Sequence, residues 1–207
     1  MSQFFQIHPD NPQPRLIKQA VDMIRSGAVT VYPTDSGYAL GCHLDDKKAF
    51  DRIRNIRQLS EKHHFTLVCR DLSELGTYAK VGNTAYRLLK AVTPGPYTFV
   101  LPATREVPRR LQQPKRKTIG LRVPANPIAQ ALLEELGEPM VSTTLILPGR
   151  EIPESDPEDI RDRLEHAVDL IIDGGFGGLE PTTVIAFEDD TPEVLRRGLG
   201  DPAPFEA

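Results

Sequence analysis

The stretch AVTVYPTDSGYALGCHLDDKKAFDRIRNIR, residues 28–57, predicts the unit from which the fold is built. Residues 28–32 are rich in β-branched and aromatic side chains and end at Pro33, which is typical of a short strand. Residues 45–57 carry apolar side chains at the spacing of one helix face. The stretch therefore predicts a strand, a loop and a helix, in that order.

The same alternation of strands and helices continues along the chain. Helical spacing predicts helices over residues 12–27, 83–92 and 126–136. Short β-rich runs predict strands over residues 65–69, 98–101, 119–123, 140–144, 170–172, 183–187 and 194–195. The late run of strands favours a mixed sheet, so the expected fold class is α/β (α+β), a twisted sheet with flanking helices. No linker or repeat divides the sequence, and we expect a single domain over residues 1–207.

The composition excludes several classes of protein. Apolar residues make up 39% of the 207 residues, enough for a packed core, and no long window is biased, so a disordered or fibrous chain is not expected. There is no apolar run long enough for a membrane helix and no signal peptide, which predicts a cytoplasmic protein that does not bind membranes. Cys42 and Cys69 are too few for a disulfide framework, and we expect both to be reduced.

The charged residues are distributed unevenly. The net charge is −4, yet residues 47–122 contain 17 Lys or Arg against 5 Asp or Glu, and residues 151–193 contain 2 Arg against 14 Asp or Glu. A cleft lined by one sign of charge concentrates ligands of the other sign, so the asymmetry predicts a positive cleft for an anion such as phosphate. The alternative is that these charges are solvated helix faces that pair with one another.

Residues 32–41 form a predicted loop with polar side chains suited to an anion. The loop supplies the hydroxyls of Thr34 and Ser36 and backbone amides freed by Gly37, a set that can bind a carboxylate or a phosphate. A plain turn between two elements uses the same residue types. The loop is therefore a candidate anion site, with the turn as the alternative.

Residues 118–124, TIGLRVP, are the second candidate. Alternation along a strand places Thr118, Gly120 and Arg122 on one face. At the strand end, Arg122 can make a two-pronged contact with a carboxylate or phosphate, or only a surface ion pair. Residue types alone thus predict an anion-binding pocket and do not specify the class of anion that it binds.

Most familiar catalytic motifs are absent. The sequence has no GKS/T phosphate loop, HExxH, GxSxG or GxGxxG pattern, and the glycine-rich residues 174–178 predict a flexible turn. His63 and His64 are adjacent, and adjacent side chains point away from each other on a strand or a helix. We therefore expect no metal site at the two histidines.

Six blocks of sequence carry a resemblance to a known family. They are YPTDSGYALG (32–41), PGPYTFVL (94–101), TIGLRVP (118–124), STTLILPG (142–149), DGG with PTTVIAF (173–187) and LRRG (195–198). In this order they resemble the YrdC-like family, the threonylcarbamoyl-adenylate synthases, and most closely its YciO branch. The resemblance implies a twisted open mixed sheet around a large, positively charged cavity that binds nucleotides and RNA.

The resemblance also implies a chemistry and a set of site residues. Enzymes of this family use ATP, L-threonine and bicarbonate, with Mg²⁺, to make threonylcarbamoyl-AMP and pyrophosphate, and a partner then acts on an adenosine of tRNA. The implied substrate-binding residues are Ser36, Arg122 and Thr182. The implied nucleotide-binding residues are Arg57, Thr118, Thr144 and Arg196. The basic middle of the chain adds, as candidates for RNA or phosphate, Lys62, Lys115, Arg116 and Lys117. No catalytic residue or resident metal is assigned.

Three positions depart from the family pattern. The family's Lys-x-Arg element ends here in Leu59, its Ser-x-Asn element ends in Ile146, and its histidine on the following strand is replaced by Val68. A hydrogen bond to a charged group contributes about 1.5–3 kcal/mol, so losing two predicts a very slow ordinary synthase reaction. Lys62 or His63, just beyond Leu59, is a candidate replacement, the alternative being that this loop is only mobile surface.

These observations predict a paralogue of the synthases that binds RNA (tRNA or double-stranded RNA) and a nucleotide (ATP or AMP). The alternative is an active L-threonylcarbamoyladenylate synthase, a nucleotidyltransferase in tRNA threonylcarbamoyladenosine modification. A third hypothesis is a protein-interaction module that uses the acidic residues 151–193. The native RNA, the native small ligand and the oligomeric state stay open.

Overall fold

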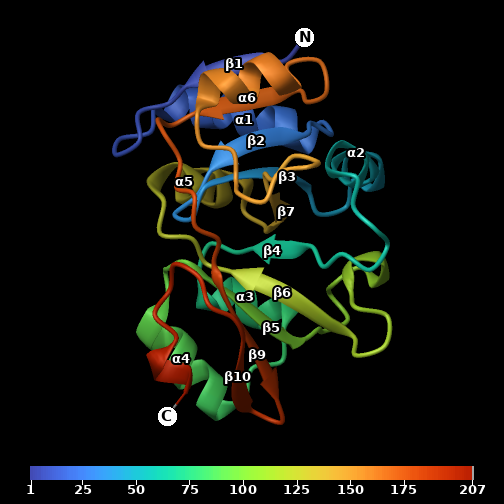
Figure 1. Ribbon diagram of the computed structural model, residues 1–207, viewed down its shortest axis with the longest axis vertical. Helices are drawn as coiled ribbons and strands as arrows, with labels where there is room; N and C mark the ends of the chain where they lie inside the picture. Colours follow the sequence, from blue (N-terminus) through green and yellow to red (C-terminus); the bar gives the residue numbers. More distant parts are fainter. Residues whose placement is uncertain (207) are drawn as a thin grey trace.

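The structure, a computed structural model, describes residues 1–206 and contains a ten-stranded sheet in the order β1-β8-β2-β3-β7-β4-β6-β5-β9-β10 (Figure 1). The strands are β1 (Gln3–Gln6), β2 (Thr30–Pro33), β3 (Tyr38–His43), β4 (Thr66–Val68), β5 (Tyr97–Pro102), β6 (Thr118–Arg122), β7 (Met140–Thr144), β8 (Leu170–Asp173), β9 (Thr183–Glu188) and β10 (Thr191–Arg196). The helices are α1 (Pro14–Arg25), α2 (Lys47–Arg57), α3 (Leu72–Tyr78), α4 (Asn83–Val92), α5 (Pro127–Leu136) and α6 (Pro157–Leu164), with 3-10 turns η1 (Arg109–Leu111) and η2 (Ala203–Phe205).

The sheet mixes parallel and antiparallel pairs, which confirms the expected fold class. β8 pairs in parallel with β1 and β2, β4 with β6, and β5 with β9, while the other neighbours are antiparallel. Parallel neighbours cannot be joined by a tight hairpin, so the chain must cross between them. Figure 1 shows the sheet turning along its length from β1, beside the N-terminus, to β9 and β10 at the far end.

Alternate side chains of the strands enter two different hydrophobic clusters, one on each face of the sheet. On β4, Leu67 belongs to the cluster that includes α2, α3, α4 and α6, whereas Val68 belongs to the cluster that includes α1 and α5. Helices α1 and α5 thus cover one face between β1 and β7. Beyond β7, the same face of the sheet carries Thr66, Gly120 and Val100, which the strand register places side by side. This part of the face becomes the floor of the site.

Helix ends follow the capping residues in the sequence. The carboxylate of Asp46 accepts a hydrogen bond from the Ala49 amide at 2.8 Å and begins α2. Helix α5 begins after Asn126 with Pro127 in its first turn and ends at Gly137, whose φ of +74° suits glycine. The predicted positions of these two helices are therefore confirmed.

Strand β3 corrects the prediction of a loop over residues 32–41. The chain turns at residues 34–37 and returns as β3 beside β2. A glycine weakens a strand pattern, and Gly41 lies in the middle of β3. Its role is steric, because a Cβ there would lie 2.8 Å from the ring of Tyr32. The prediction was wrong because the position of Gly41 in a strand is explained by a packing contact with Tyr32, which the local sequence pattern does not show.

Three further elements are not predicted from the sequence. β1 is a four-residue strand at the sheet edge, α3 is short and contains Gly76, and α6 lies in the acidic segment with few buried side chains. Each has too few periodic apolar residues to give a helix or strand pattern by itself. Within residues 1–206, none of the helices has the length and apolar character needed to cross a bilayer.

Candidate functional site

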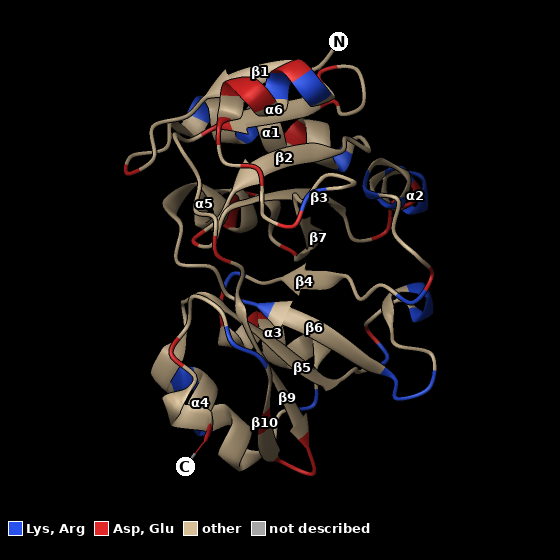
Figure 2. Cartoon of the chain, in the orientation of Figure 1, with Lys and Arg blue, Asp and Glu red and all other residues tan. Residues whose placement is uncertain are grey.

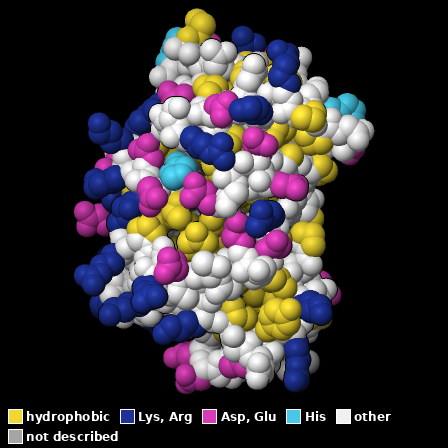
Figure 3. Space-filling model, turned by 180° about the vertical axis from the view of Figure 1, so that it is seen from behind, with side chains coloured by type: hydrophobic (Ala, Val, Ile, Leu, Met, Phe, Trp, Pro, Cys, Tyr) yellow, Lys and Arg dark blue, Asp and Glu magenta, His cyan; other side chains and the backbone are white. Residues whose placement is uncertain are grey.

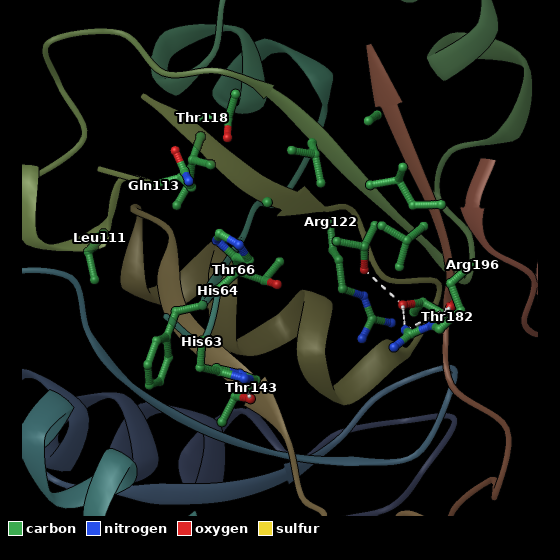
Figure 4. A pocket seen from close by; sticks show the side chains of 18 of the residues that line it. His63, His64, Thr66, Leu111, Gln113, Thr118, Arg122, Thr143, Thr182 and Arg196 are labelled. Carbon is green, nitrogen blue, oxygen red and sulfur yellow. Dashed lines mark hydrogen bonds between the residues drawn. The ribbon is translucent and has the colours of Figure 1, made fainter. Parts of the chain in front are cut away.

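A cavity of about 1040 Å³ lies against the open face of the sheet between β3 and β10. Strands β3, β4, β5, β6, β7, β9 and β10 all contribute to its wall, together with residues 62–65 and with Leu111, Gln113 and Arg116. In Figure 4, Arg122, Thr182 and Arg196 lie together at one end, and His63 lies beside Thr143 at another. The cavity therefore joins residues that are far apart in the sequence.

The strand register explains why the floor carries small and hydroxyl side chains. Thr66 lies opposite Ser142 on β7 and Gly120 on β6. At Gly120 a Cβ would lie 3.3 Å from the Thr66 hydroxyl, so the glycine leaves room in the floor. Thr118 and Arg122 line the cavity on either side of Gly120. The prediction that these three residues of β6 share one face is confirmed.

Arg122 is fixed by a buried ion pair with Asp35. Its guanidinium donates a hydrogen bond to one carboxylate oxygen, and the other oxygen accepts from the Ala125 amide at 2.9 Å. The arginine is only 7% exposed, and its Nε is buried without a hydrogen-bond partner. A buried donor without a partner costs free energy, so Arg122 holds a donor suited to a ligand oxygen. The sequence analysis did not identify Asp35, which lies 87 residues away.

Arg196 is fixed by Thr182. The arginine Nε and Nη2 donate to the Thr182 carbonyl at 3.1 and 2.8 Å, and the Thr182 hydroxyl bonds to the Thr98 hydroxyl at 2.8 Å. A shift of register between Val194 and Arg196 interrupts the pairing of β9 and β10, as β-bulges do where a side chain is re-aimed. Burial lowers the pKa of Arg196, and the charge of Arg122 lowers it further. Two guanidinium groups thus face one space.

Arg57 forms a third fixed cation. Its Nε donates to the Ile146 carbonyl at 2.8 Å and its Nη1 donates to the Thr143 hydroxyl at 2.8 Å. Burial lowers the pKa of Arg57. The ring of His63 lies 3.1 Å from the same Thr143 hydroxyl, measured from Nε2. Burial and then the charge of Arg57 lower the pKa of His63 to about 4, so its ring is neutral near neutral pH. A neutral His63 therefore does not supply the positive charge of the second basic residue of the family's Lys-x-Arg element, where this chain has Leu59.

The structure brings eight of the eleven predicted site residues to the cavity wall. These are Arg57, Lys62, Arg116, Thr118, Arg122, Thr144, Thr182 and Arg196. Lys115 and Lys117 are exposed on the neighbouring loop outside the lining. Ser36 is also outside it, buried in the turn between β2 and β3 with its Oγ 3.3 Å from the Thr34 Oγ1.

The turn at residues 34–37 uses much of its own polar capacity. The Thr34 hydroxyl donates to the Gly37 carbonyl at 2.6 Å, and that carbonyl also accepts from the Thr34 amide at 3.0 Å. Thr34 therefore serves the turn itself, which was the alternative to an anion site at this position. The contribution of this turn to the cavity comes from Asp35, through Arg122.

The loop after α2 contributes to the cavity wall. His63 and His64 both line the cavity, with the His63 ring beside Thr143 (Figure 4). Leu59 packs against the hydrophobic core, whereas Ile146 and Lys62 line the cavity. Lys62 is thus the cation that this loop offers. In residues 1–206 no group of three His, Cys, Asp or Glu side chains is placed to hold a metal ion.

Exposed Lys and Arg extend from the cavity along one side of the molecule. We call this set the basic rim, and it consists of Lys47, Lys48, Lys62, Arg109, Lys115, Arg116 and Lys117. Figure 2 shows Lys and Arg on α2 and on the loops before β4 and β6, and Figure 3 shows a column of them at one edge from behind. Arg110, in η1, connects the loop before β6 to the segment before α2, because its Nη2 donates a hydrogen bond to the Leu44 carbonyl at 2.5 Å. Glu188, Asp189 and Glu193, in β9, β10 and the turn between them, line the end of the cavity at these two strands.

The fold and site place the chain in the class of mixed α/β proteins that carry an arginine-lined cavity on the open face of one sheet. The family model of Sua5, YciO and YrdC, described as "Telomere recombination", matches residues 22–198, and the chain belongs to this family. YciO of Escherichia coli K12 is 68% identical over 205 residues, which cover 99% of this chain and 100% of that protein. The E. coli YciO crystal structure superposes with a TM-score of 0.96 at the same identity and coverage.

More distant relatives carry names that state an activity or a ligand. The threonylcarbamoyl-AMP synthase of Vibrio vulnificus is 30% identical over 185 residues, 88% of this chain and 98% of that protein. The crystal structure of P. abyssi Sua5 complexed with L-threonine has a TM-score of 0.87 and 26% identity, and the match covers 95% of this chain and 58% of that one.

Proposed function

We propose that this protein binds a nucleotide and a carboxylate-bearing amino acid in the cavity, and RNA on the basic rim. The observation that carries the proposal is the convergence of Arg57, Arg122 and Arg196 on one cavity. Among the carboxylates of residues 1–206, only Asp35 forms an ion pair with any of the three. Cations held together in partly buried surroundings favour an anion between them.

Different residues of the cavity wall suit different parts of the ligand. Arg122, whose Nε has no hydrogen-bond partner, lines the cavity with Thr182 and suits the carboxylate of an amino acid. L-threonine is the ligand named for the P. abyssi relative. Arg57, Thr118, Thr144 and Arg196 suit the phosphates of ATP or AMP. Mg²⁺ would enter with the nucleotide, because that ion binds readily through substrate phosphates and one or two carboxylates.

Isothermal titration with ATP and AMP, with and without L-threonine, tests the cavity assignment. Wild type should bind nucleotide, and L-threonine should strengthen the binding. Arg122→Ala should remove the effect of L-threonine, while Arg163→Ala, an exposed arginine on α6, should bind as wild type does. Absence of nucleotide binding by the wild-type protein would refute the proposal. A thermal unfolding scan of each variant establishes that it is folded.

Binding to the basic rim is proposed separately because it depends on exposed charge. Cations that neutralise RNA phosphates release counterions, so the affinity falls steeply as salt rises. Fluorescence anisotropy with tRNA and with duplex RNA over a salt series measures this dependence. Binding that is absent near physiological salt would refute the RNA assignment and leave the nucleotide assignment standing.

The second candidate function is synthesis of threonylcarbamoyl-AMP. The observation in its favour is the 30% identity to the V. vulnificus synthase over 88% of this chain. In that reaction the carbamate of L-threonine attacks the α-phosphate of ATP, a carbamate oxygen bonds to phosphorus, and pyrophosphate leaves. Leu59 and Ile146 offer no donor to the developing charge, so we expect a slow reaction. Pyrophosphate release that requires both L-threonine and bicarbonate would establish it.

A further inference from the structure

The imidazole of His63 lies in a hydrogen-bonded chain that begins at Arg57. Arg57 Nη1 lies 2.8 Å from the Thr143 Oγ1, and His63 Nε2 lies 3.1 Å from the same oxygen. The His63 ring also packs nearly perpendicular to the Phe65 ring, with the ring centroids 5.4 Å apart. The ring lines the cavity and is held on two sides (Figure 4).

The chemistry of the groups fixes the direction of the first hydrogen bond. A guanidinium only donates hydrogen bonds, so the Thr143 hydroxyl oxygen accepts from Arg57. The hydroxyl keeps its proton, which it can donate to His63 Nε2. In that arrangement a neutral imidazole, which carries one proton, holds it on Nδ1.

Burial, together with the charges around the ring, keeps His63 neutral. Burial first, then the charge of Arg57 on α2 and that of His64 in the same loop, lower the pKa of His63 to about 4. Lys62, the preceding residue, adds a further positive charge at the cavity wall. Thr143 and Phe65, which contact the ring, carry no charge. A neutral ring whose one proton lies on Nδ1 is a hydrogen-bond donor of one defined orientation.

We infer that His63 is a ligand-binding residue whose Nδ1–H donates to a phosphate oxygen of the nucleotide that Arg57 binds. This assignment rests on the proposed function. Arg57 supplies a positive charge to the phosphate, and Thr143 sets the tautomer of His63. His63 then supplies a neutral donor from the loop that follows α2, in which Leu59 packs against the core instead of lining the cavity. Thr143 is accordingly a positioning residue, since it acts through His63.

Titration calorimetry with AMP and with adenosine separates the phosphate contact from other effects. His63→Leu should weaken AMP binding about ten- to a hundredfold, as expected when a hydrogen bond to a charged group is lost. His63→Asn keeps a side-chain N–H near the position of Nδ1 and should restore most of the affinity. His166→Asn, at an exposed histidine after α6, is the matched control. Adenosine, which lacks the phosphate, should bind wild type and His63→Leu equally.

Nitrogen-detected NMR of the histidine rings reads the tautomer directly. In wild type, the proton should lie on Nδ1 of His63 throughout the neutral pH range, and Thr143→Val should release this preference. A proton on Nε2, or a ring that titrates with an ordinary histidine pKa, would overturn the inference.

The binding results distinguish failure of the inference from failure of the proposed function. If wild type binds AMP and His63→Leu binds it equally well, only the role of His63 is refuted. If His63→Leu loses AMP and adenosine alike, the ring contacts the nucleoside and the phosphate contact is refuted. If wild type binds no AMP, the proposed function fails and the inference fails with it.

Discussion

The cavity wall and the basic rim both carry positive charge, but they hold it in different ways. In the wall, Arg57 and Arg196 each make at least two hydrogen bonds to fixed groups, and Arg122 forms a buried ion pair. On the rim, Lys115 and Lys117 are exposed, and no salt bridge within residues 1–206 includes either of them.

This difference determines what each region can recognise. A fixed guanidinium loses little conformational freedom when a ligand binds, so the wall favours a small anion of defined shape. A mobile, solvated lysine attracts any nearby phosphate and is screened by salt. The wall is therefore suited to a nucleotide and an amino acid, and the rim to the backbone of a larger polyanion.

The largest expected effect comes from removing the acid that fixes the wall. Asp35→Ala leaves the Arg122 guanidinium buried without its carboxylate and the Ala125 amide without its acceptor. Breaking one side of a buried ion pair costs about 3–5 kcal/mol of folding free energy. Urea denaturation should show a loss of this size.

A double variant provides the control for this prediction. Asp35→Leu combined with Arg122→Met removes both charges and should recover much of the loss, because an apolar pair of similar volume can replace a buried ion pair. A loss below about 1 kcal/mol for Asp35→Ala would show that the pair is solvated and that the wall is no more fixed than the rim.

The second prediction concerns the rim. Lys115→Glu combined with Lys117→Glu reverses two exposed charges outside the cavity lining. The affinity for RNA near physiological salt should fall about ten- to a hundredfold, and the slope of log affinity against log salt should shrink by about 2. Anisotropy titrations over a salt series measure both quantities.

AMP binding serves as the internal control for the rim variant. It should change less than about threefold, because both lysines are exposed and solvent screens them from the cavity. Arg163→Glu, the same change of sign on α6, should leave RNA binding unaltered. If the rim variant loses AMP and RNA in parallel, the two regions act as one site and the comparison between them breaks down.

Local pattern predicted most of the fold but not the elements that depend on distant contacts. Helices α1, α2, α4 and α5 have clear apolar periodicity and appear where that periodicity places them. β3 was missed because Gly41 interrupts its pattern and is explained only by the ring of Tyr32 across the sheet. The mixed sheet class followed from the order of elements, whereas the strand order depends on pairings that no local window contains.

The same limit applies to the site. Alternation along one strand sufficed to place Thr118, Gly120 and Arg122 on the cavity face. The Asp35 partner of Arg122 could not be found in this way, because the pair joins a turn to a strand end 87 residues later. The role of His63 depends on the path of an irregular loop, and residue type alone does not predict that path.

The smallest expected effect tests a half-buried carboxylate near the surface that, like the arginines of the wall, is held by hydrogen bonds to fixed groups. The Asp190 carboxylate, in the turn between β9 and β10, accepts hydrogen bonds from the Ala85 and Thr84 amides at 2.8 Å each and caps α4. These bonds lower the pKa of Asp190 below its ordinary value. The group therefore stabilises the fold above the ordinary carboxyl pKa, and this contribution is lost as pH falls through the lowered pKa.

Asp190→Asn should lower Tm by a few degrees near neutral pH, because asparagine accepts the positive φ of this position but offers one oxygen in place of two. The gap in Tm between wild type and Asp190→Asn should close as the pH is lowered, since the wild-type carboxylate then takes up a proton. Asp189→Asn, the exposed neighbour with a similar backbone, should show no gap at any pH. Equal Tm values for wild type and Asp190→Asn at neutral pH would mean that α4 does not depend on this cap. The turn at the acidic end of the cavity would then be as loosely held as the basic rim.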